Sequence, residues 1–324
     1  MTPLAVDLNL LREFERGLDP RHPEHSKVPA RVLGYGEIST VFAIEGEGLR
    51  DLAFKRLPVF HSVAEIETYQ ATNERYNRLL EEEIGLRLPL HGHATLMADS
   101  GRPIFYIIQQ ELPYSSIGHR ALHVLPREEI LVLVRRVLLE LGKVWQFNQR
   151  QDGVQVAIDG QISNWAIEGF DPQDPHLDAE AQLWYVDTST PLFRIHGVEQ
   201  LDPELFLRSA PSFLAWVLRQ LFLEDVVNRY YDFHRVAVDL VANLYKEQRP
   251  DLIPDVVAVV NRVFAEEVKG LEVKPISEQE VRSYYREDAL IWTLYLGARK
   301  VDRFIRTRLL RRDYPYILPG KIER

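Results

Sequence analysis

The sequence changes character near residue 113, and this change constrains the fold more than any other feature. Before it, short β-prone runs punctuated by glycine predict three antiparallel strands, near 31–33, 40–44 and 51–57, and two more strands are expected near 93–97 and 103–110. One helix is expected among them, because residues 63–84 contain no glycine or proline. Beyond Pro113, helical patterns dominate, from residue 126 to about 149 and again from 202 to about 312.

We therefore predict an α+β protein with two lobes. Residues 1–112 would form a small β-rich N-terminal lobe, which includes a leading amphipathic helix at 8–18 and the helix at 63–84. Residues 113–324 would form a larger, mainly helical C-terminal lobe. Within that lobe, residues 151–191 have the character of short strands and loops, and they contain the candidate catalytic segment 157–190. A chain of 324 residues is long enough for two such units.

Composition excludes several classes of function. There is no cysteine, so disulfides, thiolate nucleophiles and cysteine-ligated metal sites are impossible. A net charge of -9 argues against general nucleic-acid binding, which needs a basic face. The uncharged segment Leu290–Ala298 is far shorter than the roughly 18 residues of a membrane span. Because the N-terminus also lacks the features of a secretory signal, we expect a cytoplasmic protein with no membrane contact.

The acidic balance is not uniform along the chain. Residues 299–324 hold nine Lys or Arg against three acidic residues, whereas the remainder is strongly acidic. Two interpretations stay open for this basic C-terminal segment. It is either a solvated helix face or a patch that docks an anion or a protein partner.

Two patterns in the first part fit a nucleotide site. The string Gly34-Tyr35-Gly36-Glu37-Ile38-Ser39-Thr40-Val41 lies between two expected strands, where missing side chains let backbone N–H groups approach phosphate oxygens. Strand alternation places Lys55 on the face of Ala53, next to this turn. Its ammonium would grip phosphates if a carboxylate from the following helix held it, and we prefer Glu74 over Glu67 for that role. An ordinary hairpin and a surface lysine are the alternatives.

Two patterns in the second part fit metal-assisted chemistry. Asp159 and Asn164 lie five residues apart on an expected loop, where one can orient an acceptor hydroxyl and the other can ligate Mg²⁺ through its amide oxygen. Asp187 ends an apolar run, a place typical of a turn or cap residue and also of a metal ligand.

In order, these patterns are G-x-G-x-x-S-x-V, A-x-K, D-x-x-x-x-N and a strand-terminal Asp, and over residues 30–190 they resemble the protein-kinase-like fold. The resemblance is closest to the aminoglycoside and choline phosphotransferase branch, and it extends to uncharacterised bacterial kinase-like families. It implies ATP and Mg²⁺ as cofactors. It also implies a role for each matching residue: Gly34, Gly36 and Ser39 at the phosphates, Lys55 paired with Glu74, the backbone from Gln110 to Leu112 at the adenine, Asp159 as the catalytic aspartate, and Asn164 and Asp187 as magnesium ligands.

The chain departs from the family pattern at three places. Ser39 replaces the third glycine of the phosphate loop, which many small-molecule kinases tolerate. Ala157 stands where the family has a histidine, and Thr188-Ser189 follow Asp187 in place of Phe-Gly, with no Ala-Pro-Glu further on. A regulated protein kinase is therefore disfavoured. We expect a phosphotransferase that takes a nucleotide and a small-molecule hydroxyl or amine. A nucleotide-binding pseudokinase that acts as an interaction or regulatory module, and nucleotidyl transfer onto another protein, are the alternatives.

Overall fold

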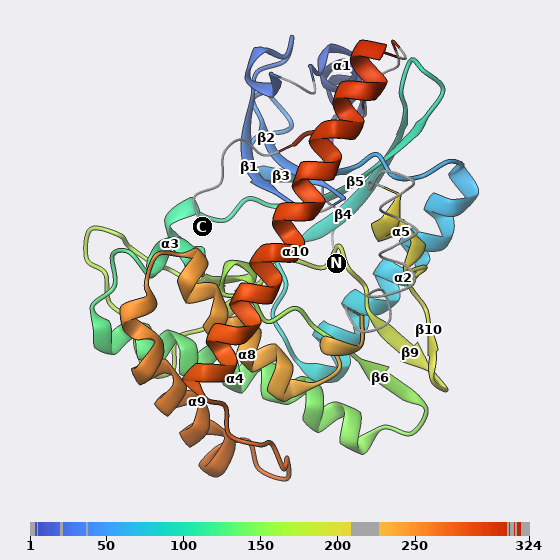
Figure 1. Cartoon of the computed structure of the whole chain (residues 1–324). Coiled ribbons are helices and arrows are strands. Elements are labelled where there is room, and N and C mark those ends of the chain that lie inside the picture. Colours follow the sequence, from blue (N-terminus) through green and yellow to red (C-terminus); the bar gives the residue numbers. More distant parts are fainter. Residues whose placement is uncertain are drawn as a thin grey trace.

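A computed structural model describes residues 4, 6–19, 22–36, 38–208, 227–309, 311, 314 and 316–318. Five strands form one antiparallel sheet in the order β1-β2-β3-β5-β4 (Figure 1). Their bounds are β1 (Ala30–Tyr35), β2 (Thr40–Ile44), β3 (Leu52–Leu57), β4 (His91–Met97) and β5 (Pro103–Gln110). The three predicted antiparallel strands and the two further strands are confirmed, and all five belong to one sheet.

Each face of this sheet packs against a helix. Phe54 and its neighbours on one face form a core with α1 (Leu8–Gly17), whose Leu11 and Phe14 are fully buried. Lys55 and the residues that alternate with it point to the other face, towards α2 (Val63–Arg78) and the cleft. The Ser62 hydroxyl caps α2 by accepting from the backbone N–H of Glu65 at 3.2 Å.

The helix at 63–84 is confirmed, although its last turn differs from a regular α-helix. A wider turn, η2 (Leu79–Ile84), completes it and ends at Gly85, whose φ of 84° is the left-handed conformation usual at a helix end. Long helices then build the second part around one large core: α4 (Arg127–Arg150), α8 (Phe233–Lys246) and α9 (Ile253–Glu266). Pro126 precedes α4, and Glu128 and Glu129 lie in its first turn.

Short elements connect these helices and carry the loops of the cleft. They are η1 (Pro23–His25), η3 (Tyr114–Ser116), α3 (Gly118–Ala121), β6 (Val154–Val156), η4 (Ile162–Asn164), β7 (Trp165–Ile167), β8 (Leu183–Tyr185), β9 (Phe193–Ile195), β10 (Val198–Glu199), α5 (Glu204–Leu207) and η5 (Pro250–Leu252). The α+β class, with a small β-rich part followed by a larger helical part, is therefore confirmed.

The last long helix, α10 (Glu278–Phe304), runs diagonally across the molecule, from the helical part to the level of the sheet (Figure 1). It continues as η6 (Ile305–Leu309). After it, Ile317 joins the core between the sheet and α1, and Tyr316 joins the core between the sheet and α2. Tyr316 and Ile317 thus pack with the first part, and the division at 112/113 stays a prediction. None of the described helices is both long and apolar enough to cross a membrane.

Candidate active site

Most of the residues predicted for the nucleotide line one pocket between the sheet and the helical part. Gly34 comes from the end of β1 and Gly36 from the β1–β2 turn, Lys55 from β3, Asn164 from η4, and Asp187 from the loop after β8. Gln110 and Leu112 line the same pocket at the end of β5. The fold thus brings segments that are far apart in the sequence around one cavity.

The glycine turn is tight. The Gly36 backbone N–H donates to the Ser39 carbonyl at 3.0 Å. A Cβ at Gly36 would lie 2.8 Å from the Ser39 hydroxyl oxygen, so a side chain there would require this hydroxyl to move. Ser39 itself is buried and lines a second, adjoining pocket.

Lys55 and Asp187 form an ion pair in the cleft. The Lys55 ammonium donates to Asp187 Oδ1 at 2.6 Å and to the Ser189 hydroxyl at 2.9 Å. The Ser189 hydroxyl and backbone N–H also donate to Asp187 Oδ1, at 2.7 and 3.0 Å. Burial alone would raise the pKa of Asp187, but Lys55 and Ser189 outweigh it and hold that pKa below its ordinary value. Asp187 is therefore ionised at neutral pH.

The predicted ion pair between Lys55 and Glu74 does not form. Glu74 Oε1 accepts from the Gln70 amide at 2.8 Å and lies 3.6 Å from His93 Nδ1, with about half of its side chain exposed. The phase of α2 explains this: Asn73 is on the buried face, and the next residue is turned by about 100° around the helix axis. Glu67, the alternative, is exposed.

Three other residues of α2 face the cleft loops, and the sequence reasoning missed them. The Tyr69 hydroxyl donates to the Ser189 carbonyl at 2.7 Å, and the Asn73 amide donates to the Thr188 carbonyl at 2.6 Å. The Tyr76 hydroxyl donates to the Ala157 carbonyl at 2.8 Å. Their spacing of four and three residues was the available signal, because it puts all three polar groups on one helix face.

The loop with Asp159 and Asn164 is tied to itself and to its neighbours. The Gln161 backbone N–H donates to Asp159 Oδ1 at 3.0 Å, and the Asn164 amide donates to the Asp159 carbonyl at 3.3 Å. Gly160 is required here by close packing, since a Cβ would lie 2.5 Å from a methyl group of Val236. Asp159 lines the second pocket, whereas Asn164 lines the first.

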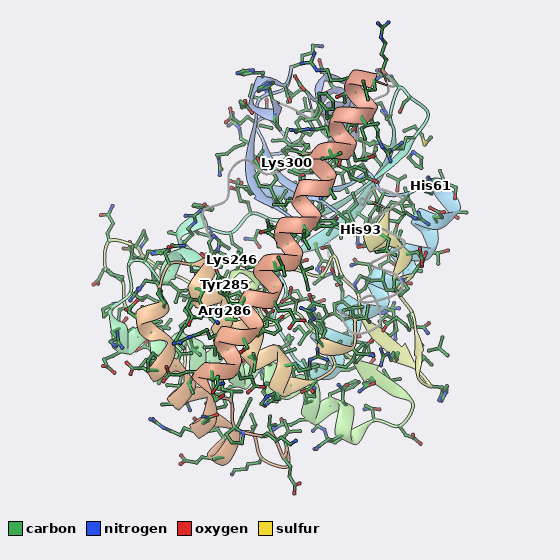
Figure 2. The ribbon with its side chains drawn as sticks, in the orientation of Figure 1. His61, His93, Lys246, Tyr285, Arg286 and Lys300 are labelled. Atoms are coloured by element: carbon green, nitrogen blue, oxygen red, sulfur yellow. The ribbon has the colours of Figure 1, made fainter. Side chains whose placement is uncertain are left out.

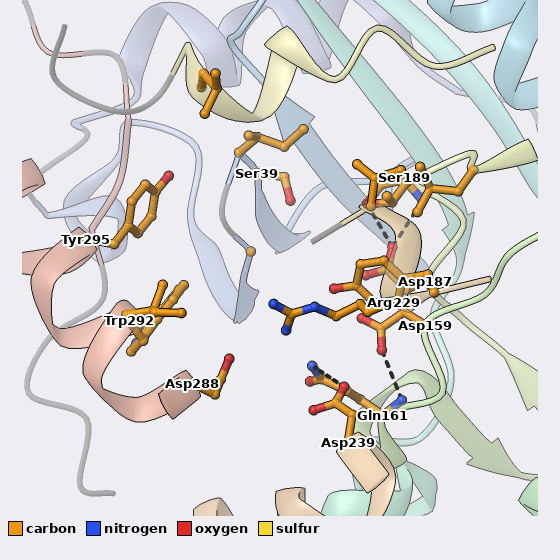
Figure 3. Close-up of a pocket in the computed structure, with 18 of the residues that line it drawn as sticks. Ser39, Asp159, Gln161, Asp187, Ser189, Arg229, Asp239, Asp288, Trp292 and Tyr295 are labelled. Carbon is orange, nitrogen blue, oxygen red and sulfur yellow. Dashed lines mark hydrogen bonds between the residues drawn. The ribbon is translucent and has the colours of Figure 1, made fainter. Parts of the chain in front are cut away.

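The second pocket adjoins the first, and Gly36 and Asp187 line both. Figure 3 shows Asp159, Asp187 and Ser189 on one side and Asp288, Trp292 and Tyr295 of α10 on the other, with the Arg229 guanidinium between them. The aromatic residues of α10 fit a core helix by their spacing alone. Tyr284, Trp292 and Tyr295 instead form a wall of this pocket.

A buried carboxyl group gives the second pocket an unusual electrostatic character. Burial and the nearby Asp288 together raise the pKa of Asp239 to about 6, although Arg229 opposes the rise. The Arg229 guanidinium donates to the Tyr284 hydroxyl at 2.9 Å. The pocket thus joins acidic groups, one guanidinium and an aromatic wall.

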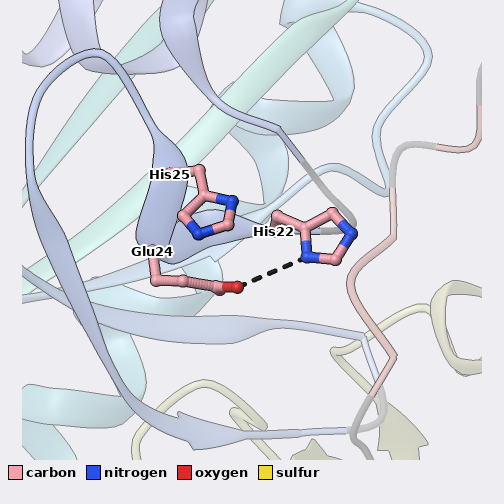
Figure 4. A group of neighbouring side chains, drawn as sticks. All are labelled: His22, Glu24 and His25. Atoms are coloured by element: carbon pink, nitrogen blue, oxygen red, sulfur yellow. Dashed lines mark hydrogen bonds and ion pairs between the residues drawn. The ribbon is translucent and has the colours of Figure 1, made fainter.

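One group outside the cleft has the composition of a metal site. The ligand atoms of His22, Glu24 and His25 lie within 4.8 Å of one another, and His22 Nδ1 is 3.3 Å from Glu24 Oε1 (Figure 4). All three side chains are exposed. None of the three lines either pocket, so they have no role in the chemistry proposed for the cleft.

Comparisons with known proteins give structural matches of low identity. A solved structure described as WaaP in complex with acyl carrier protein has 15% identity and a TM-score of 0.33, and the match covers 80% of this chain and 98% of that one. The GDP complex of wild-type aminoglycoside 2'-phosphotransferase-IIIa has 11% identity and a TM-score of 0.31, and the match covers 74% of this chain and 93% of that one. No curated protein sequence matches. Residues 22–303 match a family of unknown function, DUF6206, and the chain belongs to this family.

Proposed function

We propose that this protein is an ATP- and Mg²⁺-dependent phosphotransferase that acts on a hydroxyl or amine of a small molecule. One observation carries the proposal: a pocket lined by the glycine turn, Lys55, Asn164 and Asp187 meets a second pocket that holds Asp159. Because the two pockets share Gly36 and Asp187, a phosphoryl group bound at the turn lies next to an acceptor beside Asp159.

Each group has a distinct task in this proposal. Lys55 neutralises phosphate charge, and the glycine turn offers backbone N–H groups to phosphate oxygens. Asp159 orients the acceptor hydroxyl or amine and accepts its proton. In the segment from Gln110 to Leu112, the backbone N–H groups of Gln110 and Glu111 already donate to the carbonyl groups of Leu90 and Asp51. The N–H of Leu112 has no such partner among the described residues and is assigned to the base of the nucleotide.

Asn164 and Asp187 fit a magnesium ion. An amide oxygen and an ionised carboxylate in one pocket are hard oxygen donors of the kind that Mg²⁺ takes beside phosphates. When bound, the ion would supply further neutralisation of phosphate charge. The low pKa of Asp187 keeps this donor available at neutral pH.

A non-catalytic nucleotide-binding module is the second candidate. It is favoured by Ala157, which stands at the position of a family histidine, and by the Thr188-Ser189 pair after Asp187. Both segments are nevertheless held in place by hydrogen bonds from α2. The two candidates differ in turnover and agree on nucleotide binding.

The test is thermal unfolding of the purified protein with ATP or GTP, with and without Mg²⁺. A ligand at about 100 times its Kd stabilises the native state by about 2.7 kcal/mol, which is a clear shift of the midpoint. We expect a magnesium-dependent shift that Lys55→Ala and Asp187→Asn abolish and that the exposed control Lys269→Ala keeps. No shift with either nucleotide would refute both candidates.

A nucleotide shift then separates the candidates through turnover. We expect Asp159→Asn to keep the magnesium-dependent shift and to lose phosphoryl transfer, measured with a panel of hydroxylated and aminated acceptors and as slow nucleotide hydrolysis. Turnover that is unchanged in Asp159→Asn would remove Asp159 from the proposal. A shift without turnover in the unmodified protein would leave the non-catalytic module.

A further inference from the structure

Helix α10 has two faces with opposite surroundings. One face packs against α8 and lines the second pocket, and it buries Val281, Tyr295 and Arg299. The Arg299 guanidinium lies 5.4 Å from the ring centroids of both Tyr295 and Tyr316. The other face is open to solvent, and no described helix or strand lies over it in Figure 1.

The open face carries large apolar side chains where a surface helix usually carries polar ones. Leu290 and Leu294 are 61% and 60% exposed, and Val301 and Phe304 are 53% and 58% exposed. Isolated exposed apolar residues are common, but a contiguous row of them marks an interaction surface. The row continues into η6, and its large members are Leu290, Leu294, Val301, Phe304, Ile305 and Leu309.

The spacing along this row is that of a seam between two packed helices. Leu290, Leu294, Gly297, Val301 and Phe304 follow one another at intervals of four, three, four and three residues. This repeat averages about 3.5 residues and is the pattern of knobs-into-holes packing. A Cβ built on Gly297 meets no atom within 4 Å, so the centre of the seam faces open space. The missing side chain lets a second helix approach closely there.

The charges at the two ends of the seam select the partner and its direction. Continuing the same repeat, Glu287 precedes Leu290 and Arg308 follows Phe304, and both side chains are exposed. Glu287 lies about 15 Å from Gly297 along α10 at about 1.5 Å per residue, and Arg308 lies on the other side of Gly297, in η6. A second α10 that runs antiparallel across Gly297 would bring each Glu287 beside an Arg308. A parallel arrangement would instead place like charges together.

We propose that the open face of α10 is a homodimer interface, in which a second copy of this chain pairs antiparallel around Gly297. Two residues of the basic C-terminal segment belong to this interface: Lys300 lies beside the seam, Arg308 lies at its end, and both are exposed. Arg286 and Lys300 are labelled along the same helix in Figure 2. The proposal is independent of the nucleotide, so it is tested on the protein without ligand.

The first experiment is sedimentation velocity of the full chain over a hundredfold range of concentration. We expect a reversible monomer–dimer equilibrium, and Gly297→Lys should raise the dimer Kd at least 100-fold. Because a side chain at Gly297 meets nothing in the monomer, this variant should keep the thermal midpoint measured where the unmodified protein is monomeric. Ala265→Lys, on the exposed side of α9, is the matched control and should dimerise normally.

The second experiment tests the direction of pairing. Glu287→Arg and Arg308→Glu should each raise the dimer Kd about tenfold or more, and the double variant should restore it. A chain that stays monomeric throughout, or a dimer that survives Gly297→Lys, would overturn the proposal. A monomer that sediments with vesicles of anionic lipid through this face would also overturn it. Failure of the double variant to restore pairing would overturn the antiparallel arrangement.

Discussion

The hydroxyl group of Tyr76 is expected to support the loop that carries Asp159, and the variant Tyr76→Phe tests this directly. The Tyr76 side chain is 1% exposed, and its hydroxyl donates to the carbonyl of Ala157, which is fully buried. Burial raises the pKa of Tyr76 far above its ordinary value, so the hydroxyl remains a donor at every pH at which the protein is folded. The accepting residue, Ala157, lies two residues before Asp159, at the position where the kinase-like pattern has a histidine.

The size of the effect follows from what the substitution leaves behind. A buried carbonyl that loses its donor costs about 1–3 kcal/mol, and an ordinary intramolecular hydrogen bond contributes about 0.5–1.5 kcal/mol. We therefore expect Tyr76→Phe to lower the free energy of unfolding by about 1–2 kcal/mol. Because about 1.4 kcal/mol is a factor of ten in an equilibrium constant, opening of the loop should become roughly tenfold more frequent if the loss is local.

Hydrogen exchange of peptides that cover residues 157–164 measures this opening, and urea unfolding measures the total. The control is Tyr245→Phe, because the Tyr245 hydroxyl has no hydrogen bond among the described residues and the ring instead stacks on Tyr285. We expect faster exchange of the loop in Tyr76→Phe and unchanged exchange in the control. Equal exchange and equal stability in both variants would refute the proposed support of the loop.

Three further outcomes follow from the same contacts. Glu74→Gln should keep the nucleotide-dependent thermal shift, whereas Asn73→Ala, which removes the donor to Thr188, should reduce it in the same assay. Gly160→Ala should lower the unfolding free energy by about 1–3 kcal/mol through overpacking against Val236, as urea unfolding would show. Asp239 has a raised pKa of about 6, so the native state loses stability as the pH rises from about 4 to above 6 and this carboxyl group ionises. Asp239→Asn removes the ionisable group and should raise the thermal midpoint more at pH 7.5 than at pH 5.

The sequence predicts local order well and tertiary partners poorly. The strands and the helix at 63–84 are readable because alternation, helix formers and glycine punctuation act over short stretches of chain. The face on which Lys55 lies follows from alternation in the same way. Its partner does not, because the rotation of α2 about its own axis is set by distant residues that pack beneath it. Separation in sequence therefore favours the carboxylate of Glu74 as the partner of Lys55. In the structure, the polar face of α2 contacts the cleft loops instead.

The end of the chain shows the same limit on a larger scale. The basic residues from 299 onward indicate a solvated helix face or a docking patch. Neither interpretation predicts the buried position of Arg299. Its side chain is buried, with its guanidinium over two tyrosine rings. One of those rings, Tyr316, belongs to the core between the sheet and α2. No periodicity within this terminal segment carries information about a sheet that forms near the start of the chain.

Helix α10 links the two proposals made for this protein. The motif residues proposed for the nucleotide all precede Thr188, whereas one wall of the second pocket, proposed for the acceptor, comes from Tyr284, Trp292 and Tyr295. The sequence resemblance therefore contains no information about the acceptor, which in this proposal contacts a helix outside the motifs. The opposite face of that helix holds the proposed dimer seam. Because one helix carries both faces, pairing of two copies would fix the α10 wall of the second pocket relative to Asp159. Variants that break the dimer should therefore weaken acceptor binding more than nucleotide binding.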